Sequence, residues 1–377
     1  MYISRTIEPK INDWMFRGKI IVIYGARQTG KSTLVKKIIA DFPNDAKYFN
    51  GDESATKKLF EGAGDAAILQ KIFGAHKIVV IDEAQRIEDV GLKLKIIADN
   101  FPKQQFIVTG SSSFDLANKI SEPLTGRTVQ FQLYPFSLKE LSFVWSPPEI
   151  DSNLENLLIY GSYPAVINAT SLEEKSLILK QLVAEYLYKD ILSFDKIRKS
   201  ETIKKFTEAV SLQTGNEVSY HELASLLQIN KETAMRYLDI LEQGFILYRL
   251  GSYSRNLRSE IDRSRKIYLM DTGVRNVLIN NLNPLALRND VGPLWENFII
   301  SEFKKSQFWA ATSDPLYFWR TYQQQEIDLI KDAGGKLSAL EIKWGKPRKA
   351  PPRSFTEAYP DSSWQSITRE NYLSVLG

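Results

Sequence analysis

The octapeptide GARQTGKS at residues 25–32 constrains this chain more than any other feature of its sequence. An apolar, β-branched run at 19–24 precedes it, and a helical pattern follows over 31–40. Glycines let such a loop turn its backbone N–H groups inward, and the helix N-terminus adds partial positive charge, so the loop suits a phosphate chain. The expected nucleotide site comprises Gly25, Ala26, Arg27, Gln28, Thr29, Gly30, Lys31, Ser32 and Thr33, with Lys31 reaching the β- and γ-phosphates and Ser32 ligating Mg²⁺. The alternative is a chance glycine loop.

A second motif, KIVVIDE at 77–83, is an apolar strand that ends in two carboxylates. Ligands of open α/β sheets bind at the carboxyl ends of strands. There Asp82 is suited to hold Mg²⁺ through water, and Glu83 to polarise the water that attacks the γ-phosphate. The alternative is a strand that ends in solvated acids, and the occurrence of both motifs in one chain argues against it.

Polar groups at the ends of two further predicted strands, 105–109 and 128–133, are candidates for the same site. Thr109 and Ser111 are suited to sense the γ-phosphate or to orient the water, and Arg127 to stabilise the transferring phosphoryl oxygens. The alternatives are that the hydroxyls only satisfy a turn and that Arg127 pairs with a neighbouring acid.

Together these segments resemble the AAA+-type ATPases that occur in bacteria and archaea as stand-alone proteins. The resemblance covers 25–32, 81–85, 109–113 and 124–127, followed by 133–137. It implies a P-loop AAA+ parallel sheet with Walker A and Walker B motifs, ATP and Mg²⁺ as cofactors, and ATP hydrolysis. Because ring and clamp ATPases share this fold, the formation of a homo-oligomer is left open.

Length and composition place these motifs in a multidomain chain. At 377 residues it exceeds one ordinary hydrophobic core, and 49 basic against 45 acidic residues leave a net charge of +4, which by itself predicts neither nucleic acid nor membrane as partner. The chain has no cysteine, which excludes disulfides and thiolate metal sites. Since neither a signal pattern nor an apolar run of about 20 residues is found, we expect a cytoplasmic protein without a membrane partner.

The middle of the chain contains two predicted helical modules. Apolar residues recur at three-to-four spacing from 137 to about 194, which predicts a helical lid. A capping box at 219–222 opens one helix, and a second helix over 231–243 and a strand over 245–250 follow, as in a winged helix-turn-helix. If this unit binds DNA, Lys231, Thr233 and Arg236 face the groove. The alternative is a packing module between domains.

A basic segment follows the predicted wing. It contains Arg255, Arg258 and Arg263, and the tyrosines Tyr248, Tyr253 and Tyr268 are interleaved with its basic residues. Such a mixture suits phosphate contacts and base stacking, as in proteins that bind single strands. A solvated, arginine-rich loop is an equal alternative.

Two alternating runs near the C-terminus, 326–330 and 337–343, flank the glycines of a predicted hairpin. If Lys331 faces Lys336, Glu326 faces Glu341 and Asp328 faces Ala339. One face then carries Glu326, Asp328, Glu341 and Lys343, and the buried face carries Ile327, Leu329, Leu340 and Ile342. Clustered carboxylates repel unless a cation or a lysine neutralises them, which predicts a divalent metal site. Asp328 and Glu341 would ligate Mg²⁺ or Mn²⁺, Lys343 would orient water, and Glu296 would support them from the helix at 295–302.

This arrangement resembles the PD-(D/E)XK nuclease superfamily, and 294–298 with 318–321 look like the C-terminal domain of unknown function that accompanies this ATPase type. The resemblance implies a metal-dependent nuclease with Asp328, Glu341 and Lys343 as catalytic residues. The chain departs from the pattern at 325–328, where QEID replaces the usual proline before the first acid. Many degenerate members of the superfamily only bind, and the residues alone also allow a solvated hairpin face with inert acids.

The predicted architecture is α/β with four domains. They are an AAA+ core at 1–135, a helical lid at 136–195, a winged helix at 196–254 and a restriction-endonuclease-like domain at 255–377. The function that this predicts is an ATP-driven machine acting on nucleic acid, DNA being favoured, in which ATP hydrolysis repositions the later domains. The alternative is an ATP-dependent regulatory switch that grips a protein partner through an inactive nuclease-like domain.

Overall fold

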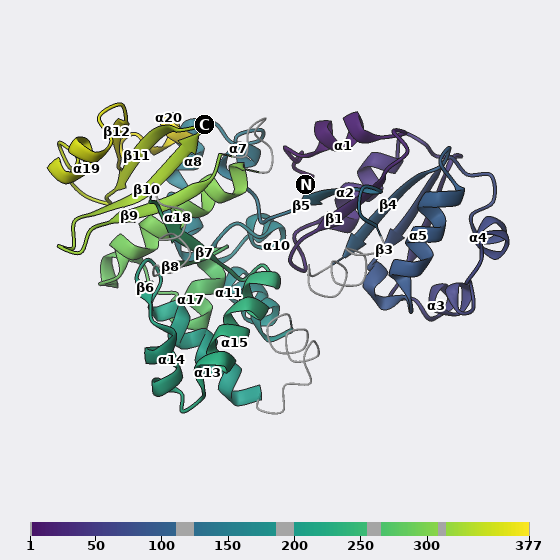
Figure 1. The fold of residues 1–377 in the computed structure, drawn as a ribbon, viewed down its shortest axis with the longest axis horizontal. Helices are drawn as coiled ribbons and strands as arrows, with labels where there is room; N and C mark the ends of the chain where they lie inside the picture. Colours follow the sequence, from purple (N-terminus) through teal and green to yellow (C-terminus); the bar gives the residue numbers. More distant parts are fainter. Residues whose placement is uncertain (1, 111–123, 186–199, 255–264, 308–313, 377) are drawn as a thin grey trace. The chain divides into compact units, whose positions relative to one another are not determined.

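The chain divides into two compact units in the computed structural model, which describes residues 2–110, 124–185, 200–254, 265–307 and 314–376. The N-terminal unit comprises residues 4–134 with 243–245, and the C-terminal unit comprises residues 1–3, 135–242 and 246–377 (Figure 1). Among the described residues, no helix is both long and apolar enough to cross a bilayer.

The N-terminal unit is built on a five-stranded parallel sheet with the strand order β2-β3-β4-β1-β5. Its strands are β1 (Ile20–Tyr24), β2 (Ala46–Asn50), β3 (Ile78–Asp82), β4 (Gln105–Gly110) and β5 (Thr128–Gln132). Its helices are α1 (Glu8–Trp14), α2 (Lys31–Ile39), α3 (Ser54–Phe60), α4 (Ala66–Phe73) and α5 (Val90–Asn100), and a 3₁₀ turn, η1 (Ala84–Arg86), follows β3. The four predicted strands and the helix after the glycine loop are therefore confirmed.

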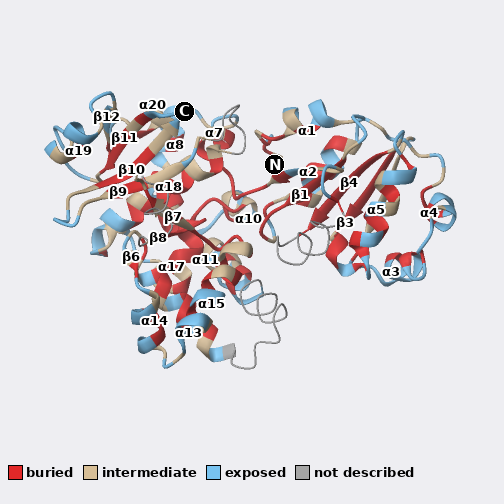
Figure 2. Cartoon of the chain, in the orientation of Figure 1, coloured by how far each residue is buried: buried red, intermediate tan, exposed pale blue. Residues whose placement is uncertain are grey.

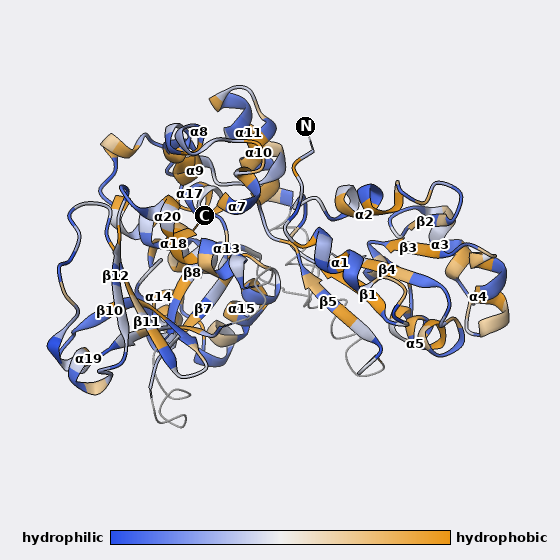
Figure 3. Cartoon of the chain, turned by 90° about the horizontal axis from the view of Figure 1, so that it is seen from above, coloured by the Kyte–Doolittle hydropathy of each residue, from blue (hydrophilic) through white to orange (hydrophobic). Residues whose placement is uncertain are grey.

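The central strands β1, β3 and β4 are apolar because helices cover the sheet on both faces. All residues of these three strands are buried (Figure 2), and most of the residues in β1 and β3 are hydrophobic (Figure 3). Since all five strands are parallel, their carboxyl ends meet at one edge. β4 lies between β1 and β3, so a residue at the end of β4 sits between the glycine loop and the carboxylates that follow β3.

The C-terminal unit contains a seven-stranded mixed sheet with the order β12-β11-β10-β9-β7-β8-β6. Its strands are β6 (Glu217–Val218), β7 (Leu247–Ser252), β8 (Arg265–Leu269), β9 (Leu316–Arg320), β10 (Glu326–Ala333), β11 (Lys336–Ile342) and β12 (Ser363–Ile367). The pairs β7–β9 and β11–β12 are parallel, and the other neighbours are antiparallel.

The same unit contains many helices. They are α7 (Leu138–Leu141), α8 (Pro147–Ser152), α9 (Leu154–Tyr160), α10 (Pro164–Asn168), α11 (Leu172–Leu182), α13 (Ser200–Leu212), α14 (Tyr220–Leu226), α15 (Lys231–Gln243), α17 (Thr272–Leu278), α18 (Val291–Ser306), α19 (Arg353–Ala358) and α20 (Tyr372–Leu376), with a 3₁₀ turn, η3 (Leu285–Leu287). Of these, α13, α17 and α18 contact the sheet. The predicted helical pattern over 137–194 is confirmed as a series of short helices as far as the described residues extend.

The two helices predicted at 219–243 are confirmed as α14 and α15, and β7 follows them. β7 and β8 pair as a hairpin, but β7 also pairs with β9 in parallel, Gly251 opposite Tyr317. One sheet thus contains strands from both sides of the predicted boundary at 254/255. Strands β6 to β8 and β9 to β12 lie in a single compact unit.

The predicted register of the β10–β11 hairpin is wrong by two residues. Ala333 pairs with Lys336, and Leu329 pairs with Leu340, because Gly334 and Gly335 both adopt positive φ angles and close a two-residue turn. Continued along the ladder, this register places Asp328 opposite Glu341 rather than opposite Ala339. A β-bulge between Ile327 and Ile330 also interrupts the alternation, so these two side chains share one hydrophobic cluster.

Candidate functional site

The glycine loop between β1 and α2 has the conformation that a phosphate-binding turn requires. Gly30 precedes the helix at φ 95°, and no side chain of the described residues caps the N-terminus of α2. A Cβ on Gly25 would lie 2.2 Å from the Leu133 carbonyl oxygen, so only glycine fits there. The Thr29 hydroxyl donates to the Ala26 carbonyl oxygen over 2.8 Å and fixes the turn.

Lys31, the first residue of α2, points back into this loop. Its side chain is buried, with 4% of its surface exposed, and its Nζ donates to the carbonyl oxygens of Gly25 at 2.9 Å and Ala26 at 2.8 Å. The ammonium therefore lies at the loop backbone, where a phosphate oxygen can take over as its partner. Of the other loop residues, Arg27 is half-buried and Gln28 is exposed, as is Thr33 in α2.

The Asp82 carboxylate at the end of β3 is buried and has a hydroxyl on each oxygen. Thr109, at the end of β4, donates to Oδ1, and Tyr48, from β2, donates to Oδ2. Burial, with Asp82 beside it, raises the pKa of Tyr48, and the nearby Ser32 opposes this rise. The phenolic oxygen of Tyr48 is thus close to both groups that the sequence assigns to Mg²⁺.

Glu83 is held in place through its backbone. It adopts a left-handed conformation at φ 50°, its N–H donates to the Thr109 hydroxyl over 3.1 Å, and its carboxylate accepts a 2.5 Å hydrogen bond from the Gln85 amide. Gly51 packs against this turn so closely that a Cβ there would lie 2.4 Å from the Glu83 carbonyl oxygen. The structure therefore brings Lys31, Ser32, Asp82, Glu83 and Thr109 to one edge of the sheet.

The prediction for Arg127 is wrong with respect to the nucleotide site of its own chain. Arg127 precedes β5, which runs parallel to β1 and pairs Ile20 with Thr128, so its backbone lies at the amino end of the sheet. Its guanidinium pairs with Asp99 over 2.7 Å at the surface, which is the alternative that the sequence left open. Ser111 lies outside the described residues.

Tyr48, Gln85 and Gly51 are the residues of this site that the sequence reasoning missed. β2 is a short strand with a half-buried pattern, and its sequence AKYFN carries no motif. Its pairing with β3 places Asn50 opposite Asp82 and Tyr48 two residues earlier. The signal that could have found it is a tyrosine in a strand neighbouring an acid-tipped strand, which is weak without the pairing.

A second polar network lies in the C-terminal unit, around the buried Lys266. This side chain is 2% exposed, and its Nζ lies 3.1 Å from Glu296 Oε1 and 2.5 Å from Glu326 Oε1. The Tyr268 hydroxyl donates to the same Glu296 oxygen over 2.6 Å. Burial, helped by the charge of Asp328, raises the pKa of Glu296 to about 7 despite the opposing effect of Lys266.

The remaining predicted acids lie on the other side of this network, around Lys343. Its Nζ lies 3.1 Å from Asp328 Oδ2 and 3.0 Å from Glu341 Oε1, and Arg348 Nη1 lies 3.4 Å from Glu341 Oε1. The Ile342 N–H also donates to Asp328 over 2.7 Å. Burial and the charge of Asp328 raise the pKa of Glu341, and no described residue donates to its buried Oε2.

The predicted metal centre at Asp328, Glu341 and Glu296 finds no support. Within the described parts of the chain, no group of three or more His, Asp or Glu side chains is arranged to hold a metal ion. The physical reason is that ammonium groups already neutralise the carboxylates: Lys266 bridges Glu296 and Glu326, and Lys343 bridges Asp328 and Glu341.

The residues predicted to contact nucleic acid differ in their exposure. Lys231 and Arg236 are exposed on α15, and Thr233 is half-buried. Tyr248 and Tyr268 are buried and stack on each other with centroids 5.8 Å apart, so the prediction that they stack on bases is wrong. Tyr253 is half-buried at the end of β7. Arg255, Arg258 and Arg263 lie outside the described residues.

Sequence comparison divides the chain into three matched regions. Residues 17–142 match a profile described as an AAA domain, and residues 151–285 and 291–373 match two domains of unknown function, DUF8612 and DUF4143. The first match and the geometry of the glycine loop identify residues 17–142 as an AAA-type P-loop domain. The other two matches assign no activity.

Relatives resemble most of the chain. An uncharacterized protein of Mycobacterium tuberculosis is 27% identical over 332 residues, covering 87% of this chain and 71% of the relative. One from Methanocaldococcus jannaschii is 25% identical over 346 residues, covering 87% and 74%. Among solved structures, the Thermotoga maritima RuvB Holliday junction branch migration motor aligns with 66% of this chain and 90% of its own, at 17% identity and a TM-score of 0.31. A likeness at this level supports no inference about what this chain binds.

Proposed function

We propose that the N-terminal unit binds and hydrolyses ATP with Mg²⁺. The observation that carries the proposal is the Tyr48 hydroxyl, which donates to Asp82 and lies close to Ser32. A hydroxyl on the first turn of α2 and a strand-tip carboxylate thus converge on one place. Hydroxyl and carboxylate oxygens are the ligands that Mg²⁺ prefers, so this donor set fits the ion.

The residues of the site divide the work of hydrolysis. The loop N–H groups and Lys31 bind the phosphates, Thr109 holds Asp82, and Glu83 accepts the proton of the attacking water. When bound, Mg²⁺ supplies positive charge that neutralises the phosphate oxygens. Gln85 and the Thr109 hydroxyl orient the Glu83 side chain and backbone, so the base starts from a fixed position.

Calorimetry with ATP and a phosphate-release assay test this proposal. Lys31→Ala should weaken ATP binding by about 10- to 150-fold, which corresponds to the loss of a hydrogen bond to a charged group. Lys77→Ala is the matched control, because Lys77 is an exposed lysine that pairs with Asp45 at the surface of the same unit. Equal binding by both variants would contradict the assignment of Lys31.

The substitution Glu83→Gln distinguishes the binding of ATP from its hydrolysis. The amide keeps the size of the side chain but cannot accept the proton, so ATP binding should persist while turnover falls by roughly 10²- to 10⁴-fold, the usual contribution of a general base. If this variant hydrolyses ATP at the wild-type rate, another group acts as the base.

We propose further that the C-terminal unit binds nucleic acid, with DNA favoured. Exposed Lys231 and Arg236 on α15 support this, as do Lys343 and Arg348, which are 43% and 40% exposed. Lys343 contacts the carboxylate network, which comprises Glu296, Glu326, Asp328 and Glu341. Binding of a labelled oligonucleotide at two salt concentrations tests it. Replacing Lys231 and Arg236 by alanine should weaken binding and flatten its salt dependence, whereas Lys180→Ala, an exposed lysine of α11, should not.

We propose that the carboxylate network binds nucleic acid without cleaving it, because Lys266 and Lys343 occupy the positions between its acids. A nuclease assay with Mg²⁺ or Mn²⁺ tests this. Cleavage by the wild type that disappears in Glu341→Ala and Lys343→Ala would overturn this proposal. The prediction that the domain is a nuclease would then hold.

The second candidate is an ATP-dependent switch that binds a protein partner. It is favoured by exposed apolar side chains on three neighbouring helices, Leu212 on α13, Leu226 on α14 and Met235 on α15. If the wild-type chain binds no oligonucleotide at low salt, this candidate becomes the better account of the C-terminal unit.

A further inference from the structure

A cavity of about 420 Å³ opens in the C-terminal unit at the carboxyl ends of the parallel strands β7 and β9. Its wall includes Ser252, Tyr253, Trp319, Tyr322 and Tyr359. Four aromatic rings thus come from the end of β7, from β9, from the β9–β10 turn and from the segment after α19. Its volume lies in the usual range for sites that hold one small molecule or one ring system.

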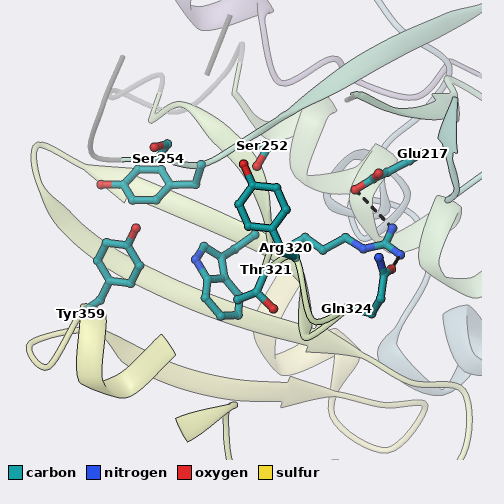
Figure 4. A pocket seen from close by; sticks show the side chains of 10 residues that line it. Glu217, Ser252, Ser254, Arg320, Thr321, Gln324 and Tyr359 are labelled. Atoms are coloured by element: carbon teal, nitrogen blue, oxygen red, sulfur yellow. Dashed lines mark hydrogen bonds and ion pairs between the residues drawn. The ribbon is translucent and has the colours of Figure 1, made fainter. Parts of the chain in front are cut away.

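The cavity carries no net charge. The charged side chains among its lining residues are Arg320 and Glu217, whose Nη1 and Oε1 atoms lie 3.2 Å apart. Figure 4 shows this pair on one side of the cavity and Tyr359 on the other. A phosphate group would find its cation already taken, whereas a neutral ring with polar edges meets aromatic faces, hydroxyls and an amide.

Tyr322 is the unusual residue of this wall. Its side chain is 98% exposed, although it sits on an ordered turn closed by hydrogen bonds from Gln324 N to Thr321 O at 3.0 Å and from Thr321 N to Gln325 O at 2.9 Å. A tyrosine side chain has only two rotatable angles, so it loses little conformational freedom when a planar ligand stacks on its ring. The side chain therefore suits the role of an outer stacking surface above the cavity.

Besides Arg320 in its wall, further cations lie next to the cavity. Arg320 also approaches Glu326, with Nη1 and Oε2 3.5 Å apart, and the Glu326 carbonyl oxygen lies 3.4 Å from Arg348 Nη1. Lys343 and Arg348 share the carboxylate of Glu341. Through Glu326, the cavity residue Arg320 is thus connected to Arg348, so cations that can contact phosphates lie beside the cavity, as the phosphates of a nucleotide lie beside its base.

We propose that this cavity binds one unpaired base of a single-stranded nucleic acid, stacked against Tyr322, while Lys343 and Arg348 contact the adjoining phosphates. The inference rests on the proposed nucleic-acid function of the C-terminal unit. A base in a duplex cannot enter, because its edges are paired and its faces are stacked, so single strands bind in preference to duplexes.

Fluorescence anisotropy with the full-length chain tests the proposal. The probes are a labelled 12-nucleotide single strand, the same sequence as a duplex, and unlabelled nucleoside monophosphates as competitors. Tyr322→Ala should weaken single-strand binding by roughly 5- to 150-fold, as expected for the loss of one base–aromatic stack, and Tyr322→Phe should restore it. Phe143→Ala, which removes an exposed aromatic ring elsewhere in the same unit, should bind like the wild type.

Photocrosslinking gives a second readout. A strand carrying one 5-iodouracil should crosslink to the peptide that contains Trp319 and Tyr322, and free monophosphates should compete only at much higher concentration. Thermal unfolding of Tyr322→Ala should match the wild type, because the removed ring is exposed.

The outcomes separate the two proposals. If the wild type binds neither single strand nor duplex at low salt, the nucleic-acid function fails, and capture of an aromatic or proline-rich peptide by Tyr322 would then identify a protein ligand. If nucleic acid binds but Tyr322→Ala and Tyr322→Phe both equal the wild type, the cavity proposal alone is overturned. If monophosphates compete as well as the strand, the cavity binds a free nucleotide. This result also overturns the proposal that the cavity binds a base of a single strand.

Discussion

Replacing Lys266 by methionine tests whether a lysine, rather than a metal, holds the carboxylate network together. The Lys266 side chain is almost completely buried over the Phe318 ring, and its Nζ contacts Glu296 and Glu326. Methionine keeps most of the apolar volume but removes the charge. Two carboxylates then stay in a poorly solvated position without their shared cation.

The expected loss of stability follows from that burial. Removing one partner of a buried ion pair costs about 3–5 kcal/mol, because the other charge stays behind uncompensated. Glu296 can escape part of this cost by taking up a proton. Its pKa is already raised to about 7 from 4.5, so the stability that protonation contributes is present at low pH and is lost as the pH rises through about 7. Without Lys266 this pKa rises further, and the variant should lose more stability at pH 8 than at pH 6.

Urea unfolding followed by tryptophan fluorescence measures this loss. Six of the seven tryptophans lie after residue 134, so the signal reports mainly the C-terminal unit. Lys336→Met, at an exposed position beside the β10–β11 turn, is the matched control and should unfold like the wild type. Equal stability of Lys266→Met and wild type at pH 8, or a loss that Mn²⁺ restores, would refute the view that lysine replaces metal here.

Two further substitutions test the nucleotide site. Tyr48→Phe removes the hydroxyl that competes with Mg²⁺ for Asp82, so the Mg²⁺-dependent gain in ATP affinity should increase, and calorimetry with and without Mg²⁺ that finds an unchanged gain would contradict this. Gly25→Ala places a Cβ 2.2 Å from the Leu133 carbonyl oxygen, so both the melting temperature and ATP binding should fall, whereas Gly64→Ala, whose Cβ meets only one atom at 4.0 Å, should be tolerated. Equal melting temperatures of the two alanine variants would show that the loop can shift.

The nucleotide site was largely predictable because each of its motifs can be recognised from residues that are adjacent in sequence. The strand, loop and helix over 19–40 are adjacent in sequence, and the apolar run at 77–83 marks a buried strand without reference to any partner. Arg127 was misplaced because its role depended on the direction of β5, which only the pairing with β1 reveals. Tyr48 was missed for the same reason, because the sequence of β2 does not indicate that this strand lies beside β3.

The carboxylate network shows what periodicity can and cannot decide. Alternation correctly placed Asp328 and Glu341 on one face, since a shift of two residues preserves the face of each side chain. The register depended on the turn, and two consecutive glycines with positive φ angles closed it earlier than predicted. Of the two neutralising cations, Lys343 lay on the predicted face, whereas Lys266 could not be identified from sequence, because it belongs to a distant basic segment and is buried only through β8.

Lys343 and Arg348 cannot neutralise the buried carboxylates and contact phosphates at the same time. In the structure their charges neutralise Asp328 and Glu341, whereas the proposed function directs the same charges to phosphate oxygens. A bound strand therefore draws cation charge away from Glu341, whose burial already opposes ionisation and whose Oε2 accepts no hydrogen bond from a described residue. Binding of the strand then favours proton uptake by Glu341. Nucleic-acid affinity should accordingly rise as the pH falls, and an affinity indifferent to pH would mean that the strand does not reach these two side chains.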